Sequence, residues 1–190
     1  MISLNVYDFD NTIYAGDSTA HFYFFCLKRH PYIMKFVPET FWHFLKHYVF
    51  KAESKTDFKE KMYKFLTMIN LSKDLEDFWL IHKKNIKGWY ILNKKSNDVI
   101  ISASPLFLLK PICGELKIKH LIASNVNPET GKYEGLNCHG EEKVKRYRKA
   151  FSGTEIQNFY SDSCSDTPLA QIAQNAFIVK GDKILKWPDI

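Results

Sequence analysis

The chain has 190 residues and a mass of 22.3 kDa, which suits one domain with a smaller insertion and excludes a multidomain assembly. Apolar residues make up 45% of it and charged residues 25%, so the composition is that of a folded protein and excludes a disordered chain. Its net charge of +6 favours anionic partners, and phosphate, nucleic acid and acidic lipid all fit that sign.

The N-terminal segment and the cysteines indicate a cytoplasmic protein. Asp8 and Asp10 interrupt the first apolar run before it could form the core of a signal peptide. The most apolar stretch, 21–45, contains several charged residues, so we expect no transmembrane segment, although peripheral membrane contact stays open. None of the four cysteines forms a close pair that would suit zinc or a redox motif.

Five short apolar runs predict the strands of a parallel sheet. In chain order they are 2–9, 98–102, 120–123, 156–160 and 176–179. Residues 141–151 have acidic residues at their N-terminal end, basic residues further along and apolar residues on one helical face. This pattern predicts a helix. Gly131 and Gly135 indicate a small β-excursion before that helix. Alternating strands and helices predict the α/β class, with a doubly wound, Rossmann-like core.

Residues 15–90 differ from the rest of the chain, because their apolar residues recur with helical periodicity and no strand pattern is evident. This stretch holds 18 of the chain's 29 aromatic residues, and its 13 Lys and Arg against 8 Asp and Glu give it a charge of +5. We therefore predict a core formed by 1–14 and 91–190 and a helical cap formed by 15–90. An insertion directly after the first strand lies above the carboxyl ends of the strands, where open α/β sheets bind ligands.

Two pairs of acidic residues follow predicted strands. Asp8 and Asp10 come after the first strand, and Asp162 and Asp166 come after the fourth. An Asx-type turn would explain the first pair alone, but two such pairs indicate one site. A few carboxylate oxygens that leave room for waters and a phosphate suit Mg²⁺ better than zinc or calcium.

A phosphate site is predicted at the end of the second strand. The Ser102 hydroxyl and the backbone N–H groups around Ala103 lie at a strand-to-helix turn. Ser104 is an alternative to Ser102 for this role, although we interpret it as the N-cap of a helix that has Pro105 at its first position. Lys143 would bring a positive charge to the same edge, although Lys145 would replace it if the helix began one residue differently.

Four segments in order, DFDNT from Asp8, ISAS from Ile101, GEEK from Gly140 and YSDSCSD from Tyr160, carry a family resemblance. They resemble the motifs of the haloacid dehalogenase-like phosphohydrolases, most closely the phosphoserine-phosphatase-like branch, where a helical cap is inserted after the first strand. The resemblance covers nearly the whole predicted core. For the predicted cap, the resemblance is limited to its position after the first strand and its helical sequence pattern.

The resemblance implies catalytic roles at three positions. Asp8 matches the nucleophile that forms an aspartyl-phosphate, and Asp10 matches the general acid and base, with its backbone carbonyl toward the metal. Lys143 matches the lysine that neutralises Asp8 and the phosphate oxygens.

The resemblance also implies the binding residues. Thr12 and Ser102, with Asn11 and Ala103 beside them, match the phosphate-binding positions. Asp162 matches the direct Mg²⁺ ligand, and Asp166 acts through a metal-bound water or by orienting Lys143.

The substrate is left open. Asp17 stands where the phosphoserine enzymes usually have a glutamate for the substrate amine, so it is a candidate for substrate specificity. We predict a Mg²⁺-dependent phosphatase acting on a small-molecule or lipid phosphomonoester, with no nucleic-acid partner. The alternatives are a lipid-phosphate phosphatase similar to those acting on phosphatidylglycerophosphate, a phosphotransferase, and a non-catalytic module that binds anions through the basic, aromatic insertion. Lys28 and Arg29 in that insertion are more typical of a solvated helix face than of a recognition patch.

Overall fold

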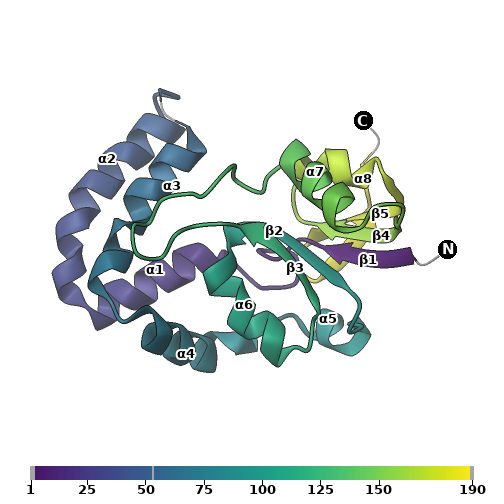
Figure 1. Cartoon of the computed structure of the whole chain (residues 1–190), viewed down its shortest axis with the longest axis horizontal. Helices are drawn as coiled ribbons and strands as arrows, with labels where there is room; N and C mark the ends of the chain where they lie inside the picture. Colours follow the sequence, from purple (N-terminus) through teal and green to yellow (C-terminus); the bar gives the residue numbers. More distant parts are fainter. Residues whose placement is uncertain (1–2, 53, 189–190) are drawn as a thin grey trace.

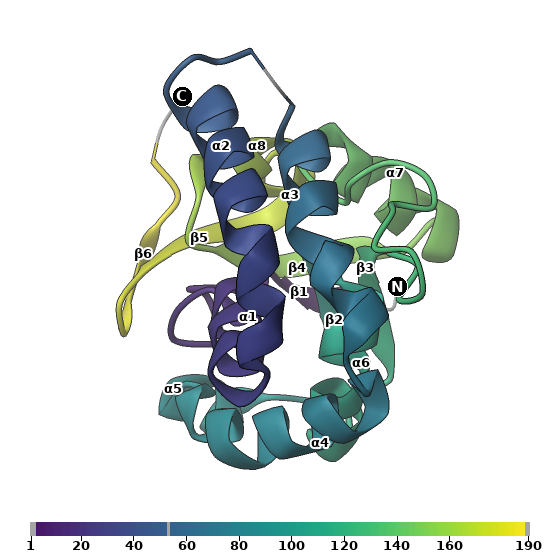
Figure 2. The ribbon, with the colours of Figure 1, turned by 90° about the vertical axis from the view of Figure 1, so that its left-hand side faces the viewer.

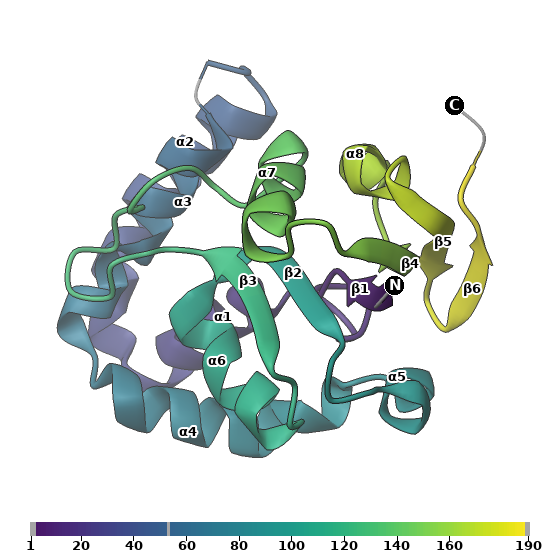
Figure 3. The ribbon, with the colours of Figure 1, turned by 45° about the vertical axis from the view of Figure 1, so that its right-hand side comes forward.

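The computed structural model describes residues 3–52 and 54–188 of the chain. Within these ranges the strands form one sheet in the order β3-β2-β1-β4-β5-β6 (Figure 3). Strands β1 to β5 are parallel, and β6 runs antiparallel to β5. The chain builds outward from β1 in one direction and then returns to its other side for β4. The predicted α/β class and doubly wound, Rossmann-like sheet are therefore confirmed.

Each predicted strand is present, with its ends moved by a few residues. The strands are β1 Ser3–Tyr7, β2 Val99–Pro105, β3 His120–Ser124, β4 Glu155–Ser161, β5 Ala173–Lys180 and β6 Lys183–Lys186. The sequence analysis missed β6, which pairs with β5 through the two-residue turn Gly181-Asp182. A Gly-Asp pair between two apolar runs is itself a hairpin signal.

The α-helices are α1 Ser18–Arg29, α2 Val37–Tyr48, α3 Lys55–Tyr63, α4 Leu71–His82, α5 Gly88–Asn93, α6 Leu106–Glu115, α7 Glu141–Ala150 and α8 Thr167–Ala170. The predicted helix at 141–151 is α7, one residue shorter. Short 3₁₀ segments lie at 31–36, 64–68, 83–85 and 164–166.

Apolar side chains on alternate strand positions bury both faces of the sheet. On one face Val6, Val99 and Ile101 pack with residues of α7 and α8. On the other, Tyr7 and Ile100 pack with residues of α1, α4 and α6. Figure 1 shows α7 and α8 on one side of the sheet and α4, α5 and α6 on the other. A strand covered on both faces reads as a continuous apolar run, which is why the sequence revealed these strands.

The helices α2 and α3 form an antiparallel pair that extends away from the sheet (Figures 1 and 2). The 125–140 segment between β3 and α7 reaches this pair, and the backbone N–H of Tyr133 donates to Glu60 of α3 at 2.8 Å. The expected small β-excursion is present as an antiparallel bridge between Val126 and Tyr133, flanked by two backbone hydrogen bonds, from Asn127 N–H to the Lys132 carbonyl and from Glu134 N–H to the Asn125 carbonyl, both at 2.8 Å. Its glycines serve a tight loop that packs on the cap. The division into core and cap at 14/15 and 90/91 stays a prediction.

Among the described residues no helix is both long and apolar enough to cross a membrane.

Gly131 and Gly135 provide a matched test of the contact between this loop and the cap. Both have positive φ, 72° and 96°, but a Cβ on Gly131 would lie 2.7 Å from the carbonyl oxygen of Tyr63, whereas one on Gly135 would meet nothing within 4 Å. Gly135→Ala should lower the free energy of unfolding by about 1–2 kcal/mol, the usual cost of a left-handed alanine. Gly131→Ala should cost measurably more in urea denaturation. Equal losses would show that the loop can move away from the cap.

Candidate active site

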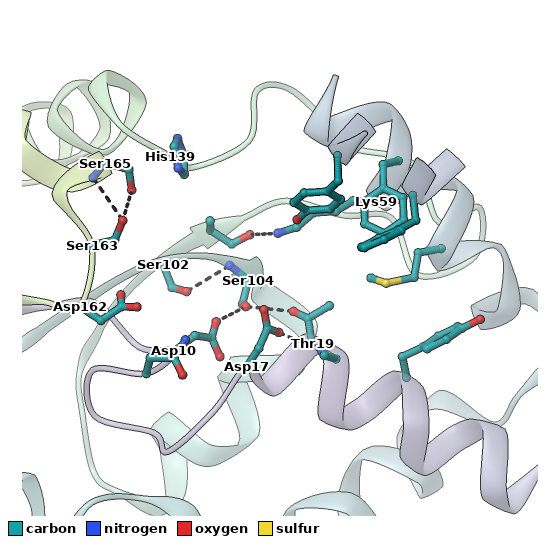
Figure 4. A pocket seen from close by; sticks show the side chains of 18 of the residues that line it. Asp10, Asp17, Thr19, Lys59, Ser102, Ser104, His139, Asp162, Ser163 and Ser165 are labelled. Carbon is teal, nitrogen blue, oxygen red and sulfur yellow. Dashed lines mark hydrogen bonds between the residues drawn. The ribbon is translucent and has the colours of Figure 1, made fainter. Parts of the chain in front are cut away.

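A cavity of about 540 Å³ lies where the carboxyl ends of the parallel strands face helices α1, α2 and α3, which are called the cap below. Asp8 directly follows β1, Ser102 and Ser104 lie near the end of β2, and Asp162 directly follows β4. Because β1 lies where the strand order reverses, the loops after β1 and β4 diverge and leave a crevice. In Figure 4 the side chains of the core gather on one side of the hollow, while Lys59 of α3 approaches from the cap.

Lys143 is the buried cation of this site. Its Nζ donates to Asp8 Oδ1 at 2.6 Å and to Asp166 Oδ2 at 2.7 Å, and the residue is only 2% exposed. The helix α7 that carries it begins after Gly140, whose φ of 56° turns the chain sharply into the site. Lys145, the alternative in the sequence, is exposed. The structure therefore places Lys143 in the site.

Asp166 is the second carboxylate that binds Lys143. Its Oδ2 also accepts a hydrogen bond from the Ser161 hydroxyl at 2.8 Å. Its Oδ1 is buried and has no hydrogen-bond partner among the described residues. Of the two roles expected for Asp166, orienting Lys143 is thus supported by direct contact, and the orphaned oxygen leaves room for a further ligand.

The carboxylates at this site outnumber the cations around them. Burial raises the pKa of Asp8 to about 7, even though the charge of Lys143 opposes that shift. Burial would lower the pKa of Lys143, but Asp8 and Asp166 reverse this effect and raise it, so the lysine is charged. Burial also raises the pKa of Asp162. One lysine thus leaves the site short of positive charge, and a further cation would stabilise the ionised carboxylates.

Asp10 lies beside Asp8 and is held at both oxygens. The backbone N–H of Ser18 donates to Oδ1 at 2.6 Å, and the Ser104 hydroxyl donates to Oδ2. Burial raises the pKa of Asp10, and the negative charge of Asp17 adds to that effect, while both hydrogen bonds oppose it. A carboxyl group with a raised pKa is suited to carry and deliver a proton.

Ser104 is not the N-cap that the sequence indicated. The N-cap of α6 is Pro105, and Ser104 lies in β2, where its hydroxyl contacts Asp10 and, at 2.9 Å, the hydroxyl of Thr19. Strand residues two apart share a face, so Ser104 lines the cavity together with Ser102. Recognising that β2 continues to Pro105 would have revealed Ser104. Nothing in the sequence singled out Thr19.

Thr12 is fully buried and is not among the residues that line the cavity. Its hydroxyl accepts from the backbone N–H of Asp162 at 2.9 Å and lies 3.4 Å from Asp8 Oδ2. It therefore ties the loop after β1 to the loop after β4. The side chain lies behind the cavity and holds the neighbouring loop, and the expected role of Thr12 in holding the phosphoryl group stays a prediction.

Asn11, in contrast, lines the cavity, and it adopts a φ of 55° that is uncommon for a residue with a side chain. Its carbonyl accepts from Lys87 Nζ at 2.6 Å, and the same ammonium group donates to the carbonyl of Gly181. Lys87 is buried and was not expected to act near the site. It anchors the loop after β1 to the turn between β5 and β6.

Two further predicted residues line the cavity. Ala103 does so at the end of β2, and its carbonyl accepts from Lys59 of the cap at 3.3 Å. Asp17 is the N-cap of α1, where its Oδ1 accepts from the N–H of Ala20 at 2.9 Å. The cap side of the cavity is mostly aromatic and apolar, and it is formed by Tyr23, Phe24, Val37, Phe41, Phe44, Tyr48, Phe58 and Met62.

The oxygen donors at the site fit Mg²⁺. Asp8 and Asp162 flank the end of the cavity near Lys143, and the orphaned Oδ1 of Asp166 lies buried beside them. The described residues include no group of three or more His, Cys, Asp or Glu side chains arranged around a single metal position. Mg²⁺ commonly uses one or two carboxylates and completes its shell with waters and substrate phosphate, so this sparse set suits it better than it suits zinc or calcium.

A model of the haloacid dehalogenase-like hydrolase family matches residues 6–171, so the chain belongs to that family. A curated relative, the probable phosphatase Rv3661 of Mycobacterium tuberculosis strain H37Rv, is 33% identical over 104 residues, which covers 47% of this chain and 36% of the relative. The chain thus matches about a third of that protein's length.

Solved structures share the fold. A protein of unknown function from Bordetella pertussis Tohama I has a TM-score of 0.76 at 20% identity, with 92% of this chain and 88% of that chain covered. A substrate-bound phosphoserine phosphatase has a TM-score of 0.60 at 14% identity, with 93% and 85% covered. The resemblance to the haloacid dehalogenase-like family is thus confirmed, and the likeness to phosphoserine phosphatases is confirmed for the fold.

Lys143→Met and Lys145→Met test the buried cation. Without Lys143 the carboxylates of Asp8 and Asp166 have no counterion, so unfolding free energy should fall by about 3–5 kcal/mol, whereas Lys145→Met should stay within about 0.5 kcal/mol. The loss should be greatest at a pH of about 8 and shrink toward a pH of about 5, because Asp8, whose folded-state pKa is raised to about 7, then binds a proton and loses its charge. Denaturation of both variants at the two pH values measures this. Similar stability for the two variants would contradict a buried ionic role for Lys143.

Proposed function

We propose that this chain hydrolyses phosphomonoesters through an aspartyl-phosphate on Asp8. The observation that carries the proposal is the convergence of a nucleophile, a proton carrier and a buried cation at one end of the cavity: Asp8, Asp10 and Lys143. The family match and the phosphatase named among the relatives support the same reaction class. A carboxylate is a weak base, and splitting the hydrolysis into two displacements makes it an effective nucleophile.

In the first displacement a carboxylate oxygen of Asp8 attacks phosphorus and the bond to the leaving alcohol breaks. Lys143 donates to Oδ1 of Asp8 at 2.6 Å, while Oδ2 lies 3.4 Å from the hydroxyl of Thr12. The alkoxide that leaves takes its proton from Asp10, whose raised pKa favours the protonated form before this step. Ser102 and the backbone at Ala103 line the cavity where they can hold the phosphoryl oxygens.

In the second displacement water attacks the phosphorus of the aspartyl-phosphate. Asp10, now ionised, accepts the proton of that water, and the bond between phosphorus and the Asp8 oxygen breaks. Inorganic phosphate leaves, and the Asp8 carboxylate and the Asp10 proton are restored. The Ser18 N–H and the Ser104 hydroxyl keep Asp10 in place during both proton transfers.

Mg²⁺ would be held by Asp8, Asp162 and the backbone carbonyl of Asp10, with Asp166 contributing through an intervening water. When bound, it would supply positive charge that offsets the carboxylates and the phosphoryl oxygens. Asp17 and the aromatic cap residues line the same cavity, and we propose that they determine which alcohols are accepted.

Asp8→Asn should abolish turnover of a generic aryl phosphate, since an amide cannot form the acyl phosphate. Asp10→Asn should slow turnover by roughly 10²–10⁴, the usual contribution of a positioned proton donor. Asp182→Asn, in the exposed turn between β5 and β6, is the matched control and should leave the rate unchanged. Phosphate release measured under single-turnover and steady-state conditions distinguishes these effects. Full activity in Asp8→Asn protein would refute the mechanism.

Metal binding is tested by thermal unfolding with and without Mg²⁺. At about 100 times its Kd the ion should stabilise the folded protein by about 2.7 kcal/mol, which for a chain of this size raises Tm by about 5–10 °C. Asp162→Asn should lose most of this shift, whereas Asp182→Asn should keep it. Ca²⁺, which prefers more ligands and looser geometry, should raise Tm without supporting turnover. Turnover that survives EDTA would contradict a role for the metal.

A further inference from the structure

Helix α2 leaves an unusual amount of apolar surface in contact with water. Of its residues only Thr40 is buried. Trp42 is 52% exposed, Val49 61% and Phe50, which follows the helix, 61%. Phe41, Phe44 and Tyr48 are also exposed. We name the surface formed by Phe41, Trp42, Phe44, Tyr48, Val49 and Phe50 the α2 face.

Helix α3 covers only part of this face. Phe58 of α3 packs on Phe44, Tyr48 and His47, while Lys64, which follows α3, pairs with Glu39 at 2.5 Å. These contacts occupy one side of α2. Trp42 and Val49, seven residues apart, share a different side, beside the stripe of Phe41, Phe44 and Tyr48 that lines the cavity. The α2 face thus runs from the edge of the cavity outward to solvent.

The charged residues between Phe24 and Ala52 are mostly positive. Between Phe24 and Ala52 the sequence has five Lys or Arg and one acid, Glu39, whose charge is offset by Lys64. Arg29 pairs with Asp74 and Asp77 of α4, and its side chain stays 38% exposed, as expected for a solvated helix face. Lys28, Lys35 and Lys51 are exposed, and Lys46 lies 5.6 Å from the ring centre of Trp42.

We propose that the α2 face docks on the surface of an anionic lipid bilayer. Helices that lie in the membrane interface combine an apolar, aromatic side with flanking lysines, and tryptophan favours the boundary between headgroups and acyl chains. Phosphate-bearing headgroups complement the unbalanced positive charge of the 24–52 segment. Lysine side chains can extend to the headgroups while their methylene stems stay on apolar surface, as the position of Lys46 over Trp42 illustrates.

Docking in this way would bring the cavity to the membrane surface. Phe41, Phe44 and Tyr48 belong both to the α2 face and to the cavity wall. An amphiphilic phosphomonoester could keep its apolar chain against these rings while its phosphate reaches Asp8. This consequence for substrate class rests on the proposed function, whereas the docking itself does not.

The test is co-sedimentation of the full chain with phosphatidylcholine vesicles, with and without phosphatidylglycerol, at low and high salt. The Asp8→Asn protein is measured in parallel, so that binding is observed without turnover. The face variant is Trp42→Ser with Val49→Ser and Phe50→Ser, and its matched control is Leu80→Ser with Leu92→Ser and Leu136→Ser, which changes equally exposed apolar residues elsewhere. The charge variant is Lys28→Gln with Lys35→Gln and Lys51→Gln, with Lys110→Gln, Lys149→Gln and Lys183→Gln as control.

Native and Asp8→Asn proteins should both bind the anionic vesicles, more strongly at low salt. The face variant should bind about tenfold more weakly than its control, since it removes the apolar groups that insert. The charge variant should lose the salt-sensitive part of the binding. Both variants should keep the native rate with a soluble aryl phosphate, which shows that they are folded.

Three results would overturn the docking. In the first, the native protein stays in the supernatant. In the second, the face variant binds vesicles as strongly as its control does. In the third, ultracentrifugation shows self-association that disappears in the face variant, because a second copy of the chain would then cover this surface. Vesicle binding by a native protein without turnover would instead refute the proposed function and leave the docking intact.

Discussion

The ammonium group of Lys143, held between the carboxylates of Asp8 and Asp166, is the interaction on which the arrangement of the site depends. All three groups are almost completely removed from water. A buried ionic cluster of this kind seldom stabilises a fold relative to apolar packing, because desolvation offsets most of the attraction. It requires three separate parts of the chain to meet within hydrogen-bond distance: the end of β1, the first turn of α7 and the segment after β4. We interpret it as a feature maintained for chemistry, with the stability supplied by the apolar cores on both faces of the sheet.

A network of polar contacts keeps these three parts in register. Thr12 joins the loop after β1 to the backbone of Asp162, and Ser161 holds Asp166. Lys87 satisfies the carbonyl of Asn11, a residue whose backbone conformation would otherwise be costly. These groups act behind the cavity. They hold the oxygens of Asp8 and the side chain of Lys143 in place, so that these groups need little rearrangement when a phosphate enters.

The cavity has two chemically different walls. The core supplies carboxylates, hydroxyls and the lysine, whereas the cap supplies mostly aromatic and aliphatic side chains from α1, α2 and α3. Such a division lets the polar wall act on the phosphoryl group and the apolar wall select the rest of the substrate. The loop after β3 touches the cap through Tyr133 and Glu60, so the position of the cap is coupled to the core. The exposed α2 face continues the apolar wall to the outside of the molecule.

The sequence by itself determined strands β1 to β5, the α/β class and most of the predicted residues that the structure brings to the cavity. Strands buried on both faces must be apolar, and acidic residues directly after such strands are costly unless they have a function, so both signals are local. Only the tertiary structure decided between Lys143 and Lys145, because a shift of the helix start by one residue changes which side chain faces inward. It also moved Thr12 behind the cavity and brought Ser104, Thr19 and Lys87 to the site. Their partners lie far away in sequence, and contacts of that kind depend on how the elements pack, which no local pattern records.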